Sequence, residues 1–279
     1  MTSNGSRLKQ SLSRRARSLG AVVIGFAPAS RWDEYGEVPP AYRPQAIWPL
    51  AKTVISMGVP MILPILESTP SINYQEMYDT SNRLLDQIAY QLSIYLITRG
   101  WGSMCLPRDG YGSLDILLQN PFASFSQVFA AKYAGLGTIG LSHNLINPQY
   151  GPRVRYAAVF TSAEIPKDRV LEGDLCNRCG ICVRLCPAHA LARRSDGVIG
   201  DLDKIACTHH HQDLAKESRW PCGICTKVCP IGEDRILFER RSTRFYLEEP
   251  VALKKDPNDE RYGSLVHLRT HGSRRGRIA

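Results

Sequence analysis

The 279-residue sequence predicts an α/β domain with a mixed sheet, followed by a small domain that is rich in cysteine. Over residues 1–170, short apolar runs alternate with helical patterns, which is typical of a sheet with helices packed on it. Eight of the nine cysteines lie between Cys176 and Cys229. We therefore expect an α/β domain at 1–170, a cysteine-rich domain at 171–235 and a basic C-terminal extension at 236–279.

Hydrophobic spacing places the elements of the first domain. Apolar residues at four-residue intervals predict an amphipathic helix near the N-terminus and a longer helix at 74–99. These two stripes comprise Leu8, Leu12, Ala16, Leu84, Ile88, Leu92 and Leu96. Apolar runs predict strands at 21–26, 53–61, 101–107 and 153–162, and a second helix is expected at 124–133. An extended segment and the turn-forming NPQYGP precede the last strand, so we expect a hairpin there.

Hydropathy and charge indicate where in the cell the protein is located. No run of 18 apolar residues occurs, so we expect no membrane span. Arg14 and Arg15 precede an apolar stretch, as in a twin-arginine export signal, but its two glycines and a proline favour a helix followed by a strand. Clustered thiols then predict a reducing, cytoplasmic location. The net charge is +9, and a basic tail is either solvated or bound to a nucleic-acid backbone. Its arginines are Arg269, Arg274, Arg275 and Arg277.

The cysteine spacing is that of a bacterial ferredoxin with two clusters. CNRCGICVRLCP has the pattern C-x2-C-x2-C-x3-C-P, in which three cysteines bind one [4Fe–4S] cluster and the fourth binds the other. CGICTKVCP is one cysteine short of this pattern, and Cys207 is the one unused cysteine nearby. Soft thiolate ligands suit iron–sulfur clusters. We assign one cluster to Cys176, Cys179, Cys182 and Cys229, and the other to Cys186, Cys207, Cys222 and Cys225.

Three other features need an interpretation. Structural zinc also uses C-x2-C pairs, but zinc sites need neither the third cysteine nor the Cys-Pro endings. The adjacent histidines His209, His210 and His211 point in different directions, so we expect a surface turn beside the second cluster and no metal site. Cys105 lies in an apolar strand, which predicts a buried structural thiol more than a catalytic one.

The order of these motifs resembles a known family. AGLGTIG, NPQYGP, the two cysteine motifs and the cysteine between them occur in the same order in the corrinoid-dependent iron–sulfur reductases: epoxyqueuosine reductase and, more distantly, the reductive dehalogenases. ARSLGAVVIGFAPA and the long helix ending in ITRGW are also similar, so the resemblance covers about residues 10–235. It implies a nitroreductase-like α/β domain that holds a base-off cobalamin, and a ferredoxin-like domain that delivers electrons to it.

The resemblance also implies where the corrinoid binds. Glycines in AGLGTIG would allow close approach to a large flat ligand, and the NPQYGP segment would contact its amide rim or phosphate. The expected contacts are Gly135, Gly137, Gly140, Tyr150, Gly151 and Arg153. Without the resemblance, the glycines indicate a tight turn between a helix and a strand. Their G-x-G-x-x-G pattern favours a dinucleotide less, because it follows a helix.

The sequence departs from epoxyqueuosine reductase at the expected proton donor. That enzyme carries an aspartate shortly before AGLG, whereas no Asp or Glu occurs from Ile116 to Ala163 here. The motif D-x-H-x-x-G, which supplies a histidine to cobalt, is also absent. We expect a cation beside a tyrosine to lower its pKa and make it a donor, although RDGYGS is also typical of a surface turn. The catalytic candidates are Asp109 and Tyr111, followed by Asp115, Tyr133 and Tyr150; the cations are Arg108 and Lys132.

Together these features predict a reductase in which two [4Fe–4S] clusters feed electrons to cobalamin. Its expected partners are an external low-potential electron donor and a substrate, which is a small molecule, a corrinoid protein or a tRNA. The missing aspartate argues against the epoxide epoxyqueuosine as the substrate of this protein. The alternative is a protein that carries clusters only and passes electrons to a partner.

Overall fold

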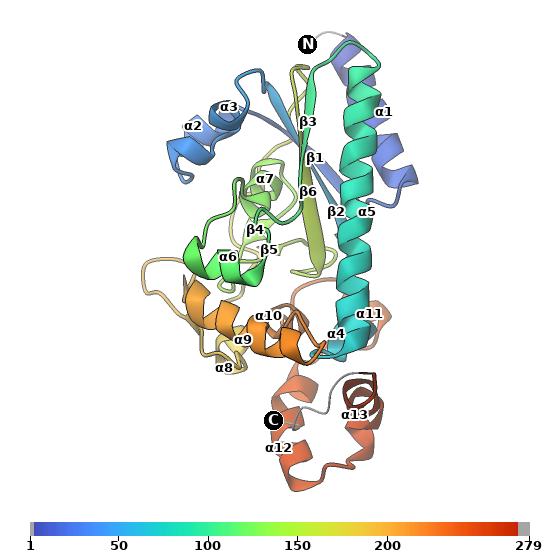
Figure 1. Ribbon diagram of the computed structural model, residues 1–279, viewed down its shortest axis with the longest axis vertical. Helices are drawn as coiled ribbons and strands as arrows, with labels where there is room; N and C mark the ends of the chain where they lie inside the picture. Colours follow the sequence, from blue (N-terminus) through green and yellow to red (C-terminus); the bar gives the residue numbers. More distant parts are fainter. Residues whose placement is uncertain (1–2, 273–279) are drawn as a thin grey trace.

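The computed structural model describes residues 3–272, and its core is a four-stranded sheet with helices on both faces (Figure 1). In spatial order the strands are β1 (Val23–Pro28), β2 (Thr53–Pro60), β6 (Val154–Thr161) and β3 (Ser103–Leu106). Each strand overlaps the apolar run that predicted it. Every neighbouring pair of strands in this sheet is antiparallel.

The expected mixed sheet is therefore wrong, for a topological reason. β2 and β3 point the same way and are connected through the long helix α5 (Ile72–Ile97), as in a β-α-β unit. β6 comes later in the chain, lies between them and runs in the opposite direction. The two parallel strands consequently never pair. Short helices flank these elements: α4 (Leu63–Glu67) and α6 (Leu114–Gln119).

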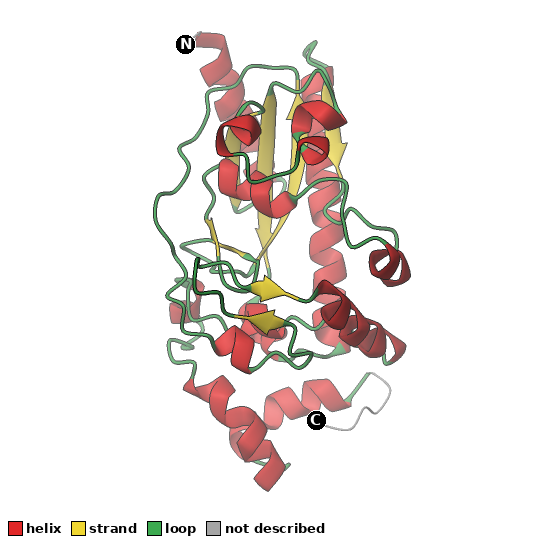
Figure 2. Cartoon of the chain, turned by 90° about the vertical axis from the view of Figure 1, so that its left-hand side faces the viewer, coloured by secondary structure: helices red, strands yellow, loops and turns green. Residues whose placement is uncertain are grey.

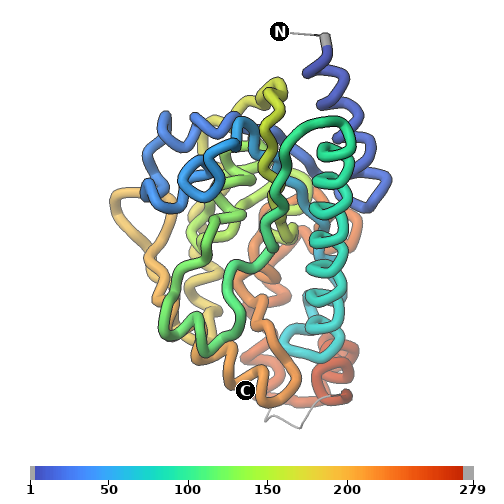
Figure 3. Tube along the Cα trace, turned by 45° about the horizontal axis from the view of Figure 1, so that its top comes forward, coloured from blue at the N-terminus to red at the C-terminus, as the bar shows by residue number. Residues whose placement is uncertain are grey.

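The sheet separates two apolar cores, and β6 contributes to both. Successive side chains of a strand point to opposite faces. Ala157 and Val159 lie in the core under α5 and α1 (Ser3–Ser18), and Figure 3 shows these two helices side by side. Tyr156 and Phe160 lie in the core on the other face. The amphipathic helices predicted from sequence are thus confirmed, with Leu12, Ala16 and Leu92 among their fully buried residues.

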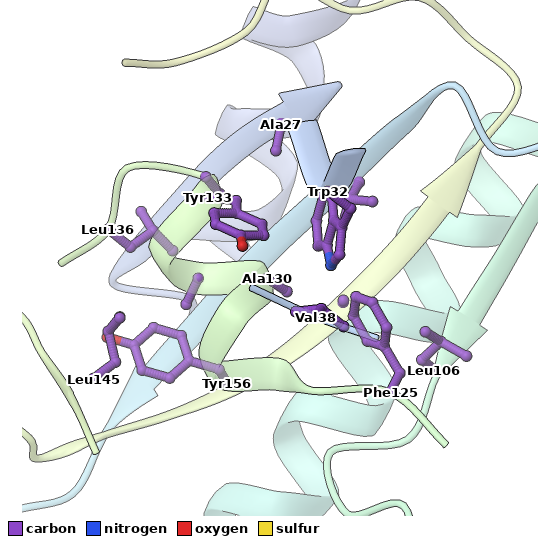
Figure 4. Packing of buried hydrophobic residues seen from close by; sticks show 14 of the residues in the cluster. Ala27, Trp32, Val38, Leu106, Phe125, Ala130, Tyr133, Leu136, Leu145 and Tyr156 are labelled. Carbon is purple, nitrogen blue, oxygen red and sulfur yellow. The ribbon is translucent and has the colours of Figure 1, made fainter. Parts of the chain in front are cut away.

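The second core lies beneath α7 (Gln127–Tyr133). Trp32 packs against Tyr133 and Phe125, with ring centroids 4.9 and 5.9 Å apart (Figure 4). The same cluster continues to Leu145 and Tyr156. Between β1 and β2 the chain forms α2 (Arg31–Tyr35), η1 (Pro40–Tyr42) and α3 (Pro44–Ile47).

A small hairpin follows α7, but it is not the expected one. β4 (Thr138–Ile139) pairs with β5 (Leu145–Ile146). The NPQYGP turn carries one isolated bridge, between Asn147 and Gly151. Asn147 accepts two amides of the turn and donates to the Leu136 carbonyl at 2.7 Å. The predicted hairpin across NPQYGP is limited to this one antiparallel pair, because β6 then pairs within the main sheet.

The cysteine-rich segment lies below the main sheet, and Figure 2 shows its two short paired strands side by side there. Its elements are α8 (Ile181–Arg184), β7 (Leu191–Ala192), β8 (Asp201–Leu202), α9 (Lys204–Lys216) and α10 (Ile224–Lys227). Gly180 and Gly223 precede α8 and α10 with φ of 76° and 66°, a conformation that favours glycine. The predicted surface turn at His209–His211 is wrong, because all three residues lie within α9.

The last described residues form a helical extension, of which α12 and α13 lie beneath the cysteine-rich segment (Figure 1). Its elements are α11 (Asp234–Leu237), α12 (Arg244–Lys255), η2 (Glu260–Tyr262) and α13 (Gly263–Thr270). Arg269 is not part of a free tail, because it lies in α13 and donates to the carboxylate of Glu249. Arg274, Arg275 and Arg277 lie outside the described residues. Among the described helices, none is long and apolar enough to cross a membrane.

Candidate iron–sulfur site and adjoining cavity

The first predicted set of cysteines converges on one small space. Cys176, Cys179, Cys182 and Cys229 all line it, together with Leu141 and Ile146 of the hairpin region. Burial and the neighbouring thiols raise the pKa of Cys182 to about 12. Free thiols in this position would stay protonated, so iron must displace their protons on binding.

The second predicted set is also brought together. Burial, followed by the thiols of Cys225 and Cys186, raises the pKa of Cys207 to about 11. The pKa of Cys222 is raised by burial and by the other three thiols. Within the described residues, no three His, Cys, Asp or Glu side chains are placed to hold a single metal ion. The cysteines of a four-iron cluster bind separate iron atoms, so they need not converge on one point.

Backbone and side-chain groups outside the motifs hold the cysteine loops. The Asn144 side chain donates to the Cys225 sulfur at 3.5 Å, and the Ala190 amide donates to the Cys186 sulfur at 3.4 Å. The Cys229 carbonyl accepts from the guanidinium groups of Arg153 and Arg235, at 3.1 and 2.7 Å. Hydrogen bonds to cluster ligands of this kind influence the reduction potential.

A cavity of about 630 Å³ adjoins the second set of cysteines. Its walls come from the proline-rich loop after β1, from the segment before α7, from β6 and from α9. Most of the lining is apolar, with Phe122, Phe125 and Phe129 on one side. Cys207 and Asn144 lie in the wall, so a predicted cluster ligand borders the cavity.

Both predicted catalytic residues line this cavity. Asp109 accepts from the Arg155 guanidinium at 2.8 Å and lies 3.6 Å from Arg108. The Arg155 guanidinium stacks over the Tyr78 ring at 4.3 Å. Tyr111 lies beside this charged group in the same wall. RDGYGS is therefore part of the cavity and not only a surface turn.

The expectation that a cation lowers the pKa of these tyrosines is wrong. Burial raises the pKa of Tyr111, and the effects of Arg155 and Arg108 in the opposite direction are smaller. Burial and a hydrogen bond to Glu37 likewise raise the pKa of Tyr133. Both phenols therefore remain protonated over the ordinary pH range, and Tyr133 donates its hydrogen bond to Glu37. The Asp115 carboxylate accepts a hydrogen bond from the side-chain amide of Gln212 in α9, at 2.5 Å.

Sequence reasoning missed Tyr156. Its side chain lines the cavity and is 7% exposed, and its hydroxyl has no hydrogen-bond partner within residues 3–272. An unsatisfied buried hydroxyl costs about 1–3 kcal/mol. No sequence motif identifies Tyr156, because it is one of several residues of β6 whose side chains face an apolar core.

The residues that the resemblance implied as corrinoid contacts do not line this cavity. A Cβ at Gly137 would stand 2.1 Å from the Ile146 carbonyl oxygen, and one at Gly151 would stand 1.9 Å from that of Ile231. These glycines let the chain pack closely against itself. Arg153 is fully buried and forms a two-pronged ion pair with Asp234. Gly135, Gly140 and Tyr150 are likewise not in the cavity lining.

The structure also gives the positions of Cys105 and His211. Cys105 is exposed, in contrast to the buried thiol expected, because β3 is an edge strand of the sheet. His211 lines the cavity, and burial followed by the neighbouring His210 lowers its pKa to about 4. A neutral imidazole therefore faces the cavity at ordinary pH.

The fold and the cysteine geometry define an α/β protein with a ferredoxin-like iron–sulfur segment. The 4Fe–4S binding domain family matches residues 170–192. The relatives with similar sequences are reductases. The tetrachloroethene reductive dehalogenase of Desulfitobacterium hafniense is 24% identical over 226 residues, which is 75% of this chain and 36% of the relative. The chain thus spans about a third of the length of that relative.

Epoxyqueuosine reductases are similar over more of their length. The Bacillus cereus enzyme is 22% identical over 80% of this chain and 64% of its own. The enzyme of Synechococcus sp. (strain CC9605) is 25% identical over 82% of this chain and 78% of its own. The chain is therefore homologous to both groups of reductases that its motifs resemble.

Solved structures agree in fold. A catabolic reductive dehalogenase in complex with 3-bromo-4-hydroxybenzoic acid aligns with a TM-score of 0.65 at 21% identity, covering 95% of this chain and 38% of that one. The Bacillus subtilis epoxyqueuosine reductase, with a catalytic aspartate loop swung out of its active site, aligns with a TM-score of 0.56 at 18% identity, covering 80% of this chain and 65% of that one.

Proposed function

We propose that this protein is an iron–sulfur reductase that carries two [4Fe–4S] clusters and passes their electrons to a molecule in the 630 Å³ cavity. The observation that carries this proposal is the position of Cys207, which belongs to the second predicted cluster and also lines the cavity. An electron acceptor in the cavity would lie against a cluster ligand. The relatives support the proposal, since all those described above are reductases.

We propose that the acceptor is a corrinoid, which the residues of the cavity fit. A corrin is a flat, mostly apolar ring with an amide rim, and the cavity offers an aromatic wall with unpaired polar atoms. The Tyr156 hydroxyl and the Gln127 side-chain carbonyl are both buried without a partner within the described chain. A solved dehalogenase at 21% identity is described as B12-dependent. When bound, a corrinoid would supply a low-potential metal centre for reduction.

The proton that the reaction consumes would come from residues of this chain. Arg155 holds Asp109 in place, and the partly buried Tyr111 keeps its proton beside it. A reductive removal of a leaving group consumes a proton, which a donor must deliver within hydrogen-bond reach. Tyr111 and Asp109 remain our candidates. We keep the proposal that the epoxide is not the substrate, because the segment 116–163 contains no carboxylate.

The nitroreductase-like classification, the domain bounds at 170 and 235, and the cytoplasmic location remain proposals as well. The competing function is electron transfer by clusters alone. Incubation of the anaerobically reconstituted protein with cobalamin, followed by desalting, separates the two. Retained absorbance of base-off cobalamin supports the reductase, and a spectrum of clusters alone supports the electron carrier.

Cluster content is tested separately. We expect about eight iron atoms per chain from the two four-iron clusters. Cys207→Ser should lose one cluster and keep the other, because the two ligand sets are distinct. Cys105→Ser is the matched control and should keep both. Two or fewer irons in the reconstituted wild type, or stoichiometric zinc, would contradict the assignment.

The substrate proposal has its own test. Chemically reduced protein is mixed once with an epoxyqueuosine-containing tRNA, and the modified nucleoside is measured. We expect no conversion. Efficient conversion would overturn the substrate proposal, and the variants Tyr111→Phe and Asp109→Asn would then show whether either residue supplies the proton.

A further inference from the structure

One predicted cluster ligand reaches the surface. Of the eight cysteines predicted to bind the clusters, Cys179 alone is exposed, while the others are partly or fully buried. Beside it lies a hollow of about 290 Å³. Its lining residues are Cys179, Gly180, Ile181, Val183, Arg184 and Arg193. None of them lines the 630 Å³ cavity, so the hollow and the cavity are separate places on the molecule.

Among the residues that the structure describes, two arginines and no acidic residue line the hollow. The Arg193 guanidinium lies over Gly180 and donates to the Cys179 carbonyl at 2.9 Å. Arg184 is exposed, and neither arginine forms an ion pair within residues 3–272. Arg178 and Arg194, by contrast, are paired with acids of the same segment. The positive charge at the hollow is therefore not neutralised.

The two sets of cysteines adjoin different parts of the molecular surface. Cys179, from the first set, meets the surface at the hollow, whereas Cys207, from the second set, meets the cavity. The two sets adjoin each other, because α8, which carries Cys182 of the first set, contacts α10, which carries Cys225 of the second. An electron entering at the hollow would cross the first cluster and then the second before it reaches the cavity.

We propose that an acidic one-electron carrier protein docks at this hollow, over Arg184 and Arg193, and reduces the cluster held by Cys176, Cys179, Cys182 and Cys229. This proposal rests on the clusters of the proposed function. The carrier loses one electron and the cluster gains it, and no bond forms or breaks. The occupant is an acidic protein because exposed, unpaired guanidinium groups attract carboxylates and the whole chain carries a net charge of +9.

The expected interface is small and electrostatic. Electron-transfer encounters bury less surface than stable complexes and dissociate quickly. Complementary charge in such interfaces raises the association rate, and the loss of a rim charge mainly lowers that rate and its dependence on salt. Arg184 is such a rim charge, because it is exposed and its side chain makes no hydrogen bond within the described residues.

The test is stopped-flow reduction of the reconstituted protein by flavodoxin hydroquinone, an acidic carrier whose flavin absorbance reports each electron. At low ionic strength we expect Arg184→Glu to react about tenfold more slowly than wild type. The difference should disappear at high ionic strength, where charges are screened. Arg7→Glu, the same charge change on the exposed face of α1 far from α8, should react like wild type (Figure 1).

Photoreduction by a small deazaflavin, which needs no docking, is the internal reference. Clusters that bleach with deazaflavin in both proteins, together with equal flavodoxin rates for Arg184→Glu and wild type, would overturn the docking surface. Clusters that accept electrons from deazaflavin but not from flavodoxin would overturn the acidic partner. A protein in which deazaflavin bleaches no cluster would contradict the proposed function itself.

Discussion

Tyr156 shows how one residue can be unfavourable for folding and useful for binding. Its hydroxyl is buried at the cavity wall with no partner in the described structure, and burial alone raises its pKa. A phenylalanine would pack against Leu145 equally well. Retaining the hydroxyl therefore makes sense if a ligand in the cavity accepts a hydrogen bond from it.

We expect Tyr156→Phe to raise the free energy of unfolding by about 1 kcal/mol, because an unsatisfied buried donor is removed. The same change should weaken cobalamin binding about tenfold, the equivalent of about 1.4 kcal/mol. Chemical denaturation and equilibrium titration followed by absorbance measure the two effects.

The control is Tyr133→Phe, whose hydroxyl donates to Glu37 at 2.9 Å and which is not in the cavity lining. That variant should lose stability and bind cobalamin normally. Reduced stability of Tyr156→Phe with unchanged binding would show that the hydroxyl has a structural partner instead.

At the scale of elements, the hairpin after α7 determines how the cysteine-rich segment meets the sheet. Gly137 and Gly140 are in contact with Ile146 across the hairpin, and the Thr138 side chain accepts the amide of Leu175 at 3.0 Å. Cys176 follows directly. A shift of β4 would therefore move the first cysteine of the motif.

Gly137→Ala tests this link. The added Cβ would lie 2.1 Å from a backbone oxygen of Ile146, so the backbone must move. We expect a loss of about 2 kcal/mol in the free energy of unfolding and a lower yield of the first cluster on reconstitution, measured by iron content and denaturation.

Gly197→Ala is the matched control, since no atom of the described residues lies within 4 Å of its added Cβ. It should differ little from wild type in stability and in iron content. Equal behaviour of the two variants would show that the hairpin tolerates the shift.

At the scale of the whole molecule, buried charges attach the C-terminal helices to the cluster segment. Glu249 of α12 bonds to Lys227 of α10 at 3.0 Å and also to Arg269 of α13. The side chains of Lys227 and Glu249 are 3% and 8% exposed. Arg269 further donates to the Glu67 and Ser68 carbonyls at the end of α4. These ion pairs therefore hold α10 and the C-terminal helices together.

We expect Glu249→Gln to lower the free energy of unfolding by about 3 kcal/mol, because it leaves two buried cations without their carboxylate. Glu248→Gln, the same change at the neighbouring exposed ion pair, should have little effect. Denaturation of the reconstituted proteins measures both. Similar behaviour of the two variants would mean that the extension is held by apolar packing alone.

The amino-acid sequence alone determined the local and periodic features. Four-residue spacing predicted α1 and α5, apolar runs predicted the strands, and cysteine spacing predicted both ligand sets, because each of these signals lies within a short stretch of chain. It also selected Asp109 and Tyr111, which the fold brings to one cavity wall.

Only the tertiary structure decided the remaining features. The insertion of β6 between β2 and β3, the burial of Arg153 against Asp234 and the exposure of Cys179 each depend on residues distant in sequence. Tyr156 could not be singled out in advance, because a hydroxyl is unsatisfied only with respect to the neighbours that folding supplies. Pairing order, burial and charge compensation are properties of the packed chain, and no local pattern encodes them.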